Sequence, residues 1–306
     1  MDEFELIRRF FERPVTTQDV LTGIGDDGAV IRPAPGLDQV QVIDTLVEAV
    51  HFPADTSASD IGYRAVAVNL SDVAAMGAEP RFMTLALTLP PKDEQWLDDF
   101  ASGLFLAANE FDVALIGGDT TSGPHVVATV QITAEVSPGK ALLRSGAKQG
   151  DSVFVTGTFG DAAAGLALLA RQQYDEFLVG RFLRPRARVR IGRRLSGRAS
   201  AAIDVSDGLV GDLGKLLSAS GVGAEIDVDR VPLSAAIRAR FDEPERLRLA
   251  MSGGDDYELC FTARSENVQD IDGVTKIGEV VGRGGLICRW HGDIVDYADS
   301  GYRHSL

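Results

Sequence analysis

A strand-length apolar run that stops at two glycines constrains this chain more than any other stretch. The run, residues 114–116, is followed at once by Gly117, Gly118, Asp119, Thr120 and Thr121. Glycine lets the backbone turn and lets a bulky ligand approach closely. In open α/β architectures, ligands bind beyond the carboxyl ends of the strands. The stretch therefore predicts a strand that ends at a binding site, with Asp119 at its mouth.

Aspartates recur in the same setting along the chain. Those that follow apolar runs, lie beside glycines or stand at expected element ends are Asp26, Asp27, Asp44, Asp72, Asp204 and Asp207. Any one of them is also explained as a helix cap or a turn residue, since Asp favours both positions. As a set they point to a shared site, because caps do not need apolar strands that end in Gly-Gly-Asp.

Converging carboxylates need a cation. Two carboxylates about 4 Å apart repel each other by about 4 kcal/mol at an effective dielectric constant of ~20. A cluster of this kind must therefore be protonated or bound to cations. Oxygen ligands with no His or Cys nearby suit Mg²⁺, Mn²⁺ or Ca²⁺ rather than Zn²⁺.

Length and charge narrow the class of protein. A chain of 306 residues is longer than one ordinary core supports, so two domains are expected, 1–145 and 146–306. The net charge is −15, from 45 acidic and 30 basic residues, and no basic stripe offsets it. Such a surface repels nucleic acid and anionic membranes. An anionic substrate would need metal ions as a bridge.

Two further features indicate the compartment. No run approaches the ~18 apolar residues of a membrane-spanning helix, and the N-terminus is acidic where a signal peptide would be basic. Cys260 and Cys288 each lie in an apolar, strand-like run. Buried thiols in a reducing compartment are expected from this pattern. The prediction is a cytoplasmic protein.

Periodicity and turn signals predict the elements of the first half. The helices are expected at residues 2–12, 59–76 and 93–110. The strands are expected at residues 30–31, 40–43, 83–89, 114–116 and 126–136. Ser59 and Asp93 are the candidate N-caps of the second and third helices, and Gly77 is the candidate C-cap of the second. The middle helix is almost wholly apolar and should be buried.

The second half repeats the alternation of strands and helices. The helices are expected after Asp161, at 186–198, and from a cap at Ser206 or Asp207 to about residue 219. The strands are expected at residues 153–156, 200–205, 224–228, 257–262, 274–281 and 285–290. The loop at 157–161 has neither the dinucleotide-binding nor the P-loop spacing. The fold class is α/β (α+β), with mixed sheets covered by helices.

Seven segments match, in order and spacing, the motifs of a known family. They are residues 22–27, 44–52, 69–77, 116–121, 144–148, 203–209 and 252–259, which read TGIGDD, DTLVEAVHF, NLSDVAAMG, IGGDTT, RSGAK, IDVSDGL and SGGDDYEL. On these residues the chain resembles the thiamine-monophosphate kinase family of the aminoimidazole-ribonucleotide-synthetase-like superfamily. The resemblance covers nearly the whole chain.

The resemblance implies an activity and an assembly. Members of this family use ATP and several Mg²⁺ ions to convert thiamine monophosphate to thiamine diphosphate, the last step of thiamine diphosphate biosynthesis. The N-terminal domain is expected to bind ATP and Mg²⁺ and to form a homodimer. The C-terminal domain is expected to complete the substrate site.

The resemblance also assigns roles by position. The residues that match metal ligands are Asp27, Asp44, Asp72, Asp119, Asp204 and Asp207. The residues that match ATP contacts are Gly118, Asp119, Arg144 and Ser206. The residues that match the thiamine-phosphate pocket are His51, Asp255 and Tyr302.

Three positions depart from the family pattern. Val42 and Ile43 stand where the family often has Ser-Thr, so a hydroxyl ligand of one metal ion is absent. Asp255 replaces a more usual Glu and reaches one methylene less far. Tyr302 stands at an aromatic position where Trp is also common.

The chemistry of the residues supports phosphoryl transfer independently of the family resemblance. Transfer to a phosphate oxygen needs charge neutralisation and in-line positioning more than covalent help. The acceptor is already anionic, so no general base is required, and direct transfer without a phosphoenzyme is expected. Arg144 would add a forked, permanently charged donor to the phosphates.

Other functions fit parts of the sequence. Selenophosphate synthetase would call for a reactive cysteine near the N-terminal glycine loop, and residues 1–50 contain none. Aminoimidazole ribonucleotide synthetase, or another ATP-dependent superfamily member with a different phosphorylated acceptor, shares the metal pattern. A non-catalytic nucleotide-binding or Ca²⁺-binding module is the alternative from a different class. Release of ADP would separate an enzyme from such a module.

Overall fold

The chain forms two compact units in a computed structural model that describes residues 3–14 and 17–297. Unit 1 comprises Met1–Val73 and Ala78–Gly139. Unit 2 comprises Ala74–Gly77 and Lys140–Leu306. Helix α2, whose last two residues fall in unit 2, is otherwise part of unit 1.

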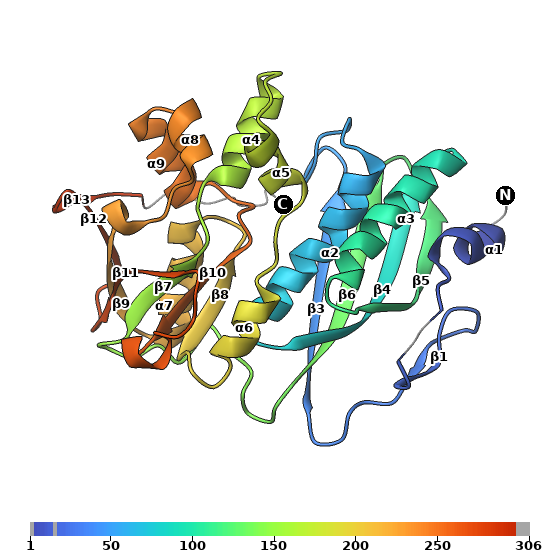
Figure 1. Cartoon of the computed structure of the whole chain (residues 1–306), viewed down its shortest axis with the longest axis horizontal. Coiled ribbons are helices and arrows are strands. Elements are labelled where there is room, and N and C mark those ends of the chain that lie inside the picture. Colours follow the sequence, from blue (N-terminus) through green and yellow to red (C-terminus); the bar gives the residue numbers. More distant parts are fainter. Residues whose placement is uncertain (1–2, 15–16, 298–306) are drawn as a thin grey trace. The chain divides into compact units, whose positions relative to one another are not determined.

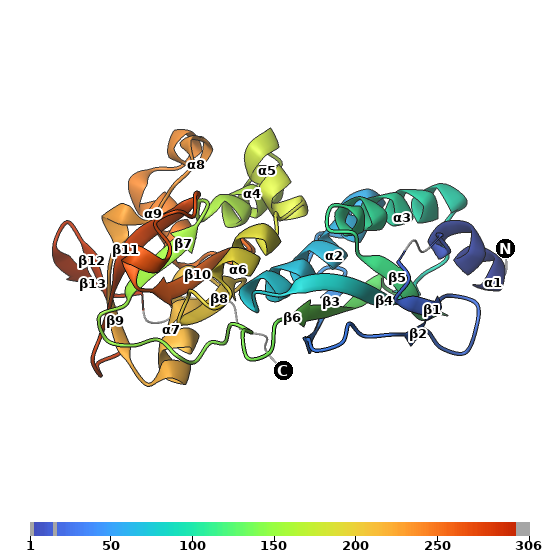
Figure 2. The ribbon, with the colours of Figure 1, turned by 60° about the horizontal axis from the view of Figure 1, so that its bottom comes forward.

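Unit 1 is a four-stranded sheet covered by two long helices. Its elements are α1 (Glu3–Leu6), the π-helical turn η1 (Ile7–Phe11), β1 (Val20–Thr22), β2 (Val30–Ile31), β3 (Asp38–Val47), α2 (Ala58–Ala75), β4 (Glu79–Leu89), α3 (Glu94–Asn109), β5 (Ala114–Ser122) and β6 (Val127–Val136). The strand order is β3-β6-β4-β5, with β4 and β5 parallel and the other neighbours antiparallel. Helices α2 and α3 lie on the same side of this sheet (Figures 1 and 2).

Alternation along the strands explains which face the helices cover. In β6, Ala128, Val130 and Ile132 are fully buried, while the residues between them are partly exposed. In β3, Leu46 is buried and Ile43 is 64% exposed. Successive side chains of a strand point to opposite faces. The apolar set therefore packs under α2 and α3. The other face carries Thr, Gln, Ala and Ile side chains together with Asp119 and Glu135.

Two glycines allow α2 and α3 to pack closely. A Cβ atom on Gly103 of α3 would lie 1.9 Å from the carbonyl oxygen of Ser59 in α2. A Cβ atom on Gly62 of α2 would lie 2.1 Å from the carbonyl oxygen of Phe100 in α3. No side chain fits at these distances, so the helix contact depends on both glycines.

The ends of the helices confirm some predicted caps and correct one. The Asp93 Oδ1 atom accepts a hydrogen bond from the Trp96 amide at 2.8 Å, as predicted. Gly77 has φ +67 and its amide donates to Ala74, which is a glycine C-cap. The N-cap of α2 is Ser57 and not Ser59, because the Ser57 Oγ atom accepts from the Asp60 amide.

The strand predicted at residues 114–116 continues further than the sequence suggested. β5 runs through Gly117, Gly118 and Asp119 to Ser122, and Asp119 pairs with Ala86 of β4. The placement of Asp119 beyond the end of a strand was therefore wrong. A register shift between Met83 and Thr84 leaves Ile116 as the extra residue of a bulge, directly before the two glycines. A Cβ atom on Gly118 would lie 1.9 Å from the carbonyl oxygen of Leu85, so the close approach that requires glycine is made by the neighbouring strand.

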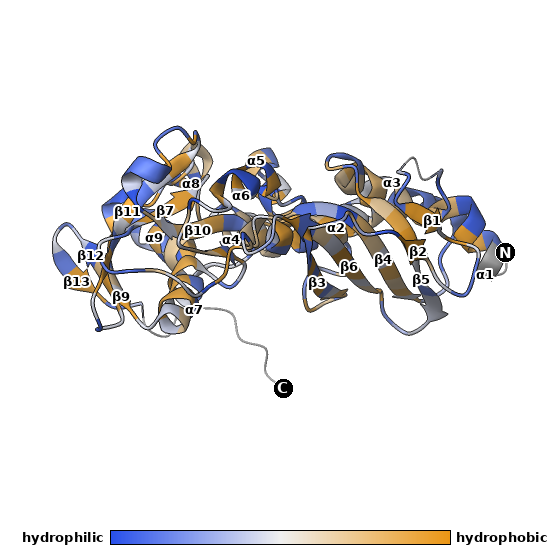
Figure 3. Ribbon diagram, turned by 90° about the horizontal axis from the view of Figure 1, so that it is seen from below, coloured by the Kyte–Doolittle hydropathy of each residue, from blue (hydrophilic) through white to orange (hydrophobic). Residues whose placement is uncertain are grey.

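Unit 2 contains a seven-stranded sheet and most of the helices. Its elements are β7 (Ser152–Thr156), α4 (Asp161–Ala170), α5 (Glu176–Leu183), α6 (Val189–Leu195), β8 (Ala201–Val205), α7 (Leu209–Ser220), β9 (Gly223–Asp227), η2 (Val228–Arg230), α8 (Ala235–Arg240), α9 (Glu243–Ser252), β10 (Glu258–Ala263), η3 (Ser265–Asn267), β11 (Val274–Val281), β12 (Leu286–Trp290) and β13 (Asp293–Val295). The strand order is β13-β12-β9-β11-β7-β10-β8. Figure 3 shows apolar residues along the central strands β7 and β10.

Most strands of unit 2 were predicted to within one or two residues, and several helices were not. Helices α5, α8 and α9 and strand β13 were missed, and the predicted helix 186–198 is only Val189–Leu195. Helix α7 begins after Gly208 without a side-chain cap, so neither Ser206 nor Asp207 caps it. Among the described strands of this sheet, only β9 and β12 pair in parallel. The expectation that ligands bind beyond the carboxyl ends of parallel strands is therefore a poor guide here.

The cysteines lie where the sequence predicted. Cys260 in β10 and Cys288 in β12 are free thiols in the core. Burial raises the pKa of the Cys288 thiol to about 11 and raises that of Cys260 further. Among the described residues, every helix is too short or too polar to cross a bilayer.

The contact of α2 with α3 gives a stability test. Gly103→Ala should destabilise the protein by about 1–3 kcal/mol, because the added methyl group overlaps the Ser59 backbone. Gly180→Ala in α5 is the matched control, since no atom lies within 4 Å of its Cβ position. It should be neutral or stabilising by up to ~1 kcal/mol through helix propensity. Urea unfolding of both variants checks this, and equal effects would contradict the packing argument.

Candidate functional site

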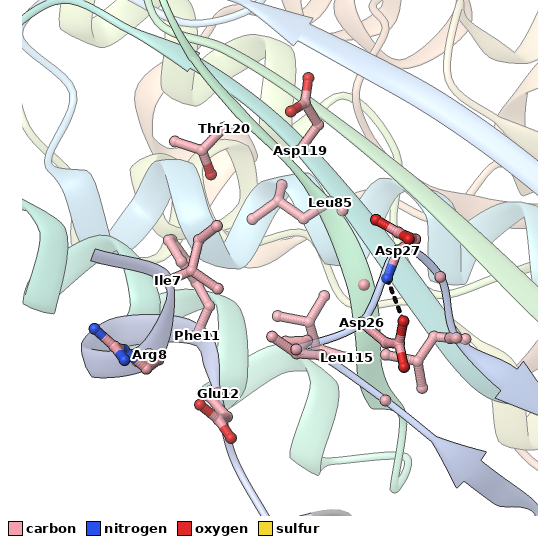
Figure 4. A pocket seen from close by; sticks show the side chains of 18 residues that line it. Ile7, Arg8, Phe11, Glu12, Asp26, Asp27, Leu85, Leu115, Asp119 and Thr120 are labelled. Carbon is pink, nitrogen blue, oxygen red and sulfur yellow. Dashed lines mark hydrogen bonds between the residues drawn. The ribbon is translucent and has the colours of Figure 1, made fainter. Parts of the chain in front are cut away.

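A pocket of about 680 Å³ opens in unit 1 beside the edge strand β5 (Figure 4). The η1 turn, the glycine-rich loop that precedes β2, and the Gly117–Thr120 part of β5 line it. Leu85 and Leu115 are among its apolar lining residues. The pocket therefore gathers segments that are more than 100 residues apart in the chain.

Carboxylates occupy one side of the pocket. Asp26 and Asp27 come from the loop, and Asp119 comes from β5 (Figure 4). All three are exposed to solvent. The Asp26 Oδ1 atom accepts from the Asp27 amide at 2.8 Å, which orders the tip of the loop. The structure therefore brings together Asp27, Gly118 and Asp119, three of the predicted site residues.

Charged side chains of the N-terminal turn also line the pocket, and the sequence analysis missed them. Arg8 and Glu12 lie on the side opposite the aspartates (Figure 4). Both are exposed, whereas Phe10 and Phe11 of the same turn are buried. The helical period could have found them, because the polar face of a helix whose apolar face is buried must point to solvent or to a ligand.

The other predicted residues of unit 1 do not line this pocket. Asp44 is half-buried in the middle of β3, which continues to Val47, and Asp72 is half-buried on α2. Ile43 points to the opposite face of β3 from Asp44. A side chain at position 43 would therefore not bind the same metal ion as Asp44. The His51 Nδ1 atom accepts from the Val47 amide at 3.0 Å, which fixes the turn after β3.

In unit 2 the predicted residues cluster on one loop. Asp204 is buried in β8, and Ser206 and Asp207 follow the end of this strand. The amides of Ser206 and Asp207 both donate to the Asp212 Oδ2 atom, at 3.0 and 2.9 Å. Burial raises the pKa of Asp212, and Lys215 bonds both Asp212 and Asp207. Asp212 therefore orders the loop, and it was absent from the predicted set.

The remaining predicted residues of unit 2 differ in their surroundings. Asp255 is half-buried and its amide donates to the Ser206 carbonyl at 2.8 Å. Arg144 is exposed, and its guanidinium makes no ion pair within the described ranges. Its carbonyl oxygen accepts from the Ser220 Oγ atom. Tyr302 lies outside the described residues.

Two fully buried carboxylates follow Asp255. Asp256 accepts from the Gly160 and Ala162 amides, at 2.7 and 3.3 Å, and burial raises its pKa well above the ordinary value. Glu258 is bound by Arg181 at 2.9 Å and by Arg188 at 2.5 Å. Fixed donors replace the water that these carboxylates lose on folding.

The donor set of the pocket suits a hard divalent cation. It consists of exposed carboxylate oxygens and the Thr120 hydroxyl, without His or Cys. Within residues 3–14 and 17–297, no group of three His, Cys, Asp or Glu side chains is arranged to hold a metal ion by itself. Mg²⁺ is commonly held by one or two carboxylates together with substrate phosphates and water. The exposed pair Asp27 and Asp119 fits that kind of site.

Comparison with known proteins identifies the family. Residues 25–136 match the family described as AIR synthase related protein, N-terminal domain, and residues 148–291 match the corresponding C-terminal domain. The thiamine-monophosphate kinase of Salmonella typhimurium is 50% identical over 277 residues, which cover 88% of this chain and 85% of that protein. The chain belongs to the thiamine-monophosphate kinase family.

Solved structures of this family share the fold. The thiamine-monophosphate kinase of Stenotrophomonas maltophilia K279a superposes with a TM-score of 0.88 at 42% identity, over 96% of this chain and 98% of that one. A structure described as AaThiL complexed with AMPPCP and TMP has a TM-score of 0.81 at 32% identity, over 99% of this chain and 96% of that one. The family resemblance and the predicted fold class, mixed sheets covered by helices, are therefore confirmed.

Burial separates two kinds of acidic residue in this member of the thiamine-monophosphate kinase family. Glu258→Gln should destabilise the protein by about 3 kcal/mol, because two guanidinium groups lose a buried partner. Asp27→Asn should leave the urea midpoint unchanged or raise it, since Asp27 is exposed and its loss removes negative charge from the pocket. Urea unfolding followed by circular dichroism checks both, and a large loss in Asp27→Asn would assign that residue a structural role.

Proposed function

We propose that the chain transfers the γ-phosphoryl group of ATP to thiamine monophosphate, giving ADP and thiamine diphosphate, the last step of thiamine diphosphate biosynthesis. The observation that carries this proposal is the likeness, over almost all of the chain, to thiamine-monophosphate kinases and to AaThiL complexed with AMPPCP and TMP. The acid-lined pocket that contains Gly118 and Asp119 supports it.

The proposed metal ligands are the aspartates that match the family positions. They are Asp27, Asp44, Asp72, Asp119, Asp204 and Asp207. Mg²⁺, when bound, would neutralise the developing charge on the transferring phosphoryl group. The exposure of Asp27 and Asp119 supports direct ligation, because their oxygens need not leave fixed donors to reach a cation. Asp207 is paired with Lys215, so an ion at Asp207 would compete with that ammonium group.

The proposed ATP contacts are Gly118, Asp119, Arg144 and Ser206. Gly118 and Asp119 line the pocket of unit 1. Ser206 follows β8, on a loop ordered by Asp212. Arg144 is supported as a hydrogen-bond donor to the phosphates by its exposed guanidinium, whose forked N–H groups suit a bidentate contact.

The acceptor contacts that we propose are His51, Asp255 and Tyr302. A monoester phosphate is already anionic near neutral pH, so the chain needs to position it rather than deprotonate it. Transfer is proposed to be direct, and a phosphoprotein trapped by rapid quench from labelled ATP would contradict this. We place the reaction in the cytoplasm, which the two buried free thiols support.

We also propose a homodimer that forms through unit 1. The part of the sheet face opposite α2 and α3 that surrounds Ile43 supports it, since the in-register side chains there, Thr84 and Gln131, are uncharged. Ile43 of β3 is 64% exposed on this face, beside the Thr45–Thr129 hydroxyl pair. A second copy packed against this part of the face would bury these uncharged groups.

Activity can be tested directly. Purified protein incubated with ATP, Mg²⁺ and thiamine monophosphate should form thiamine diphosphate, detected by chromatography, and omission of Mg²⁺ should abolish the product. Asp119→Ala should lower the rate at least about 100-fold while leaving the fold intact. Asp98→Ala on the exposed side of α3 is the control and should be fully active.

The outcomes separate the alternatives. ADP without thiamine diphosphate would keep the nucleotide site and reassign the acceptor to another phosphorylated compound. ATP binding without ADP release would favour a non-catalytic nucleotide-binding module. A fully active Asp119→Ala variant would remove Asp119 from the metal and ATP site.

The homodimer has its own test. Ile43→Lys should convert the dimer to a monomer in analytical ultracentrifugation, because two buried ammonium groups would face each other or the apolar partner surface. Leu106→Lys on α3 is a matched control, since Leu106 is 54% exposed on the helix side. A wild-type monomer, or a dimer that survives Ile43→Lys, would rule out this interface.

A further inference from the structure

The segment 252–257 of unit 2 is held in an unusual backbone conformation. Asp255 has φ +71 and Tyr257 has φ +50. Non-glycine residues seldom adopt positive φ, and a bulky residue such as tyrosine does so only when its surroundings require it. Residues in such conformations cluster at functional sites. Asp255 is one of the proposed acceptor contacts.

Close contacts join this segment to the loop that follows β8. The Asp255 amide donates to the Ser206 carbonyl at 2.8 Å, and the Tyr257 amide donates to the Val205 carbonyl at 2.9 Å. A Cβ atom on Gly254 would lie 2.5 Å from the Ser206 carbonyl oxygen. The proposed acceptor residue and the proposed nucleotide residue Ser206 are therefore parts of one packed structure.

Asp256, between the two strained residues, anchors the segment from the other side. Its side chain is fully buried, and its two carboxylate oxygens accept from the Gly160 and Ala162 amides at the N-terminus of α4. Its carbonyl oxygen accepts from Arg181 at 2.9 Å. Negative charge is favoured at a helix N-terminus, where amides lack partners within the helix.

We propose that Asp256 is a positioning residue that clamps segment 252–257 to the N-terminus of α4 and so holds Asp255 in its left-handed conformation against Ser206. The inference rests on the proposed function in one respect, namely that Asp255 contacts the acceptor. The backbone constraint itself does not depend on the reaction. The clamp sets the distance between the acceptor residue and the loop that carries Ser206.

The variant Asp256→Asn tests the clamp by kinetics. An amide keeps the shape of the side chain but presents an N–H group to one of the two donors of α4, so one contact is lost. We expect the KM for thiamine monophosphate to rise at least about tenfold, since a displacement of about 1 Å can cost up to ~100-fold. A loss of folded protein alone would lower the apparent kcat and leave the KM unchanged.

Two further variants keep the test decisive. Gly254→Ala pushes the segment away from Ser206 without removing a buried carboxylate, and it should raise the same KM. Asp151→Asn is the matched control, because Asp151 is 2% exposed and bonds Lys148 and Ser200 at the far end of β7 from Thr156. It should lower stability and leave the KM unchanged.

Hydrogen exchange read by mass spectrometry gives an outcome independent of activity. The amides of Asp255 and Tyr257 should exchange faster in Asp256→Asn and Gly254→Ala than in the wild type, and Asp151→Asn should leave them protected. Unchanged exchange in both of the first two variants would overturn the clamp. Faster exchange with an unchanged KM would overturn the role of the clamp in substrate binding. A wild-type protein that makes no thiamine diphosphate would instead contradict the proposed function, and the exchange result would still decide the clamp.

Discussion

Removal of carboxylates from water is the constraint on which this structure depends. A buried carboxylate is tolerated only where fixed donors replace its hydration. Unit 2 meets this condition with the amides at the start of α4 for Asp256 and with two arginines and Thr156 for Glu258. These contacts join β10 to β7, α4 and α5. The carboxylates of Asp26, Asp27 and Asp119 need no such set of fixed donors, because they stay exposed to water at the pocket of unit 1.

The same constraint separates structural from ligand-binding acids. An exposed carboxylate retains water that a cation or a ligand group can replace at small cost, whereas a carboxylate fixed by amides must first give up its donors. Asp27 and Asp119 belong to the first kind and Asp256 to the second. Asp207 is intermediate, because Lys215 already neutralises it. A chain with net charge −15 thus uses part of its acidity to fix backbone segments and leaves the rest for a cationic ligand.

The sequence predicted elements better than it predicted where they end. Asp119 and Asp44 were placed after strands, yet both lie inside strands, because pairing with β4 and β6 extends β5 and β3 beyond their apolar runs. Gly118 was attributed to a ligand and is required by the Leu85 carbonyl of β4. Asp212 was missed, because its importance comes from the Ser206 loop that it orders, which no local pattern reveals. Arg8 was also missed, although its place on the polar face of an amphipathic turn was a local signal. The assignments of metal, ATP and acceptor residues stay predictions.

The sequence by itself determined the family, the order of most strands and helices, and the burial of α2 and of both cysteines. These follow from motif spacing and from apolar periodicity, which are local properties. Only the tertiary structure decided which acids are buried, at which glycines two backbone segments come close, and how Asp255 and Ser206 come together. Those outcomes depend on contacts between residues about 50 to 100 positions apart, such as Asp255 with Ser206 and Asp256 with Gly160. Donors for a buried carboxylate are supplied by the fold, and no local sequence pattern records them.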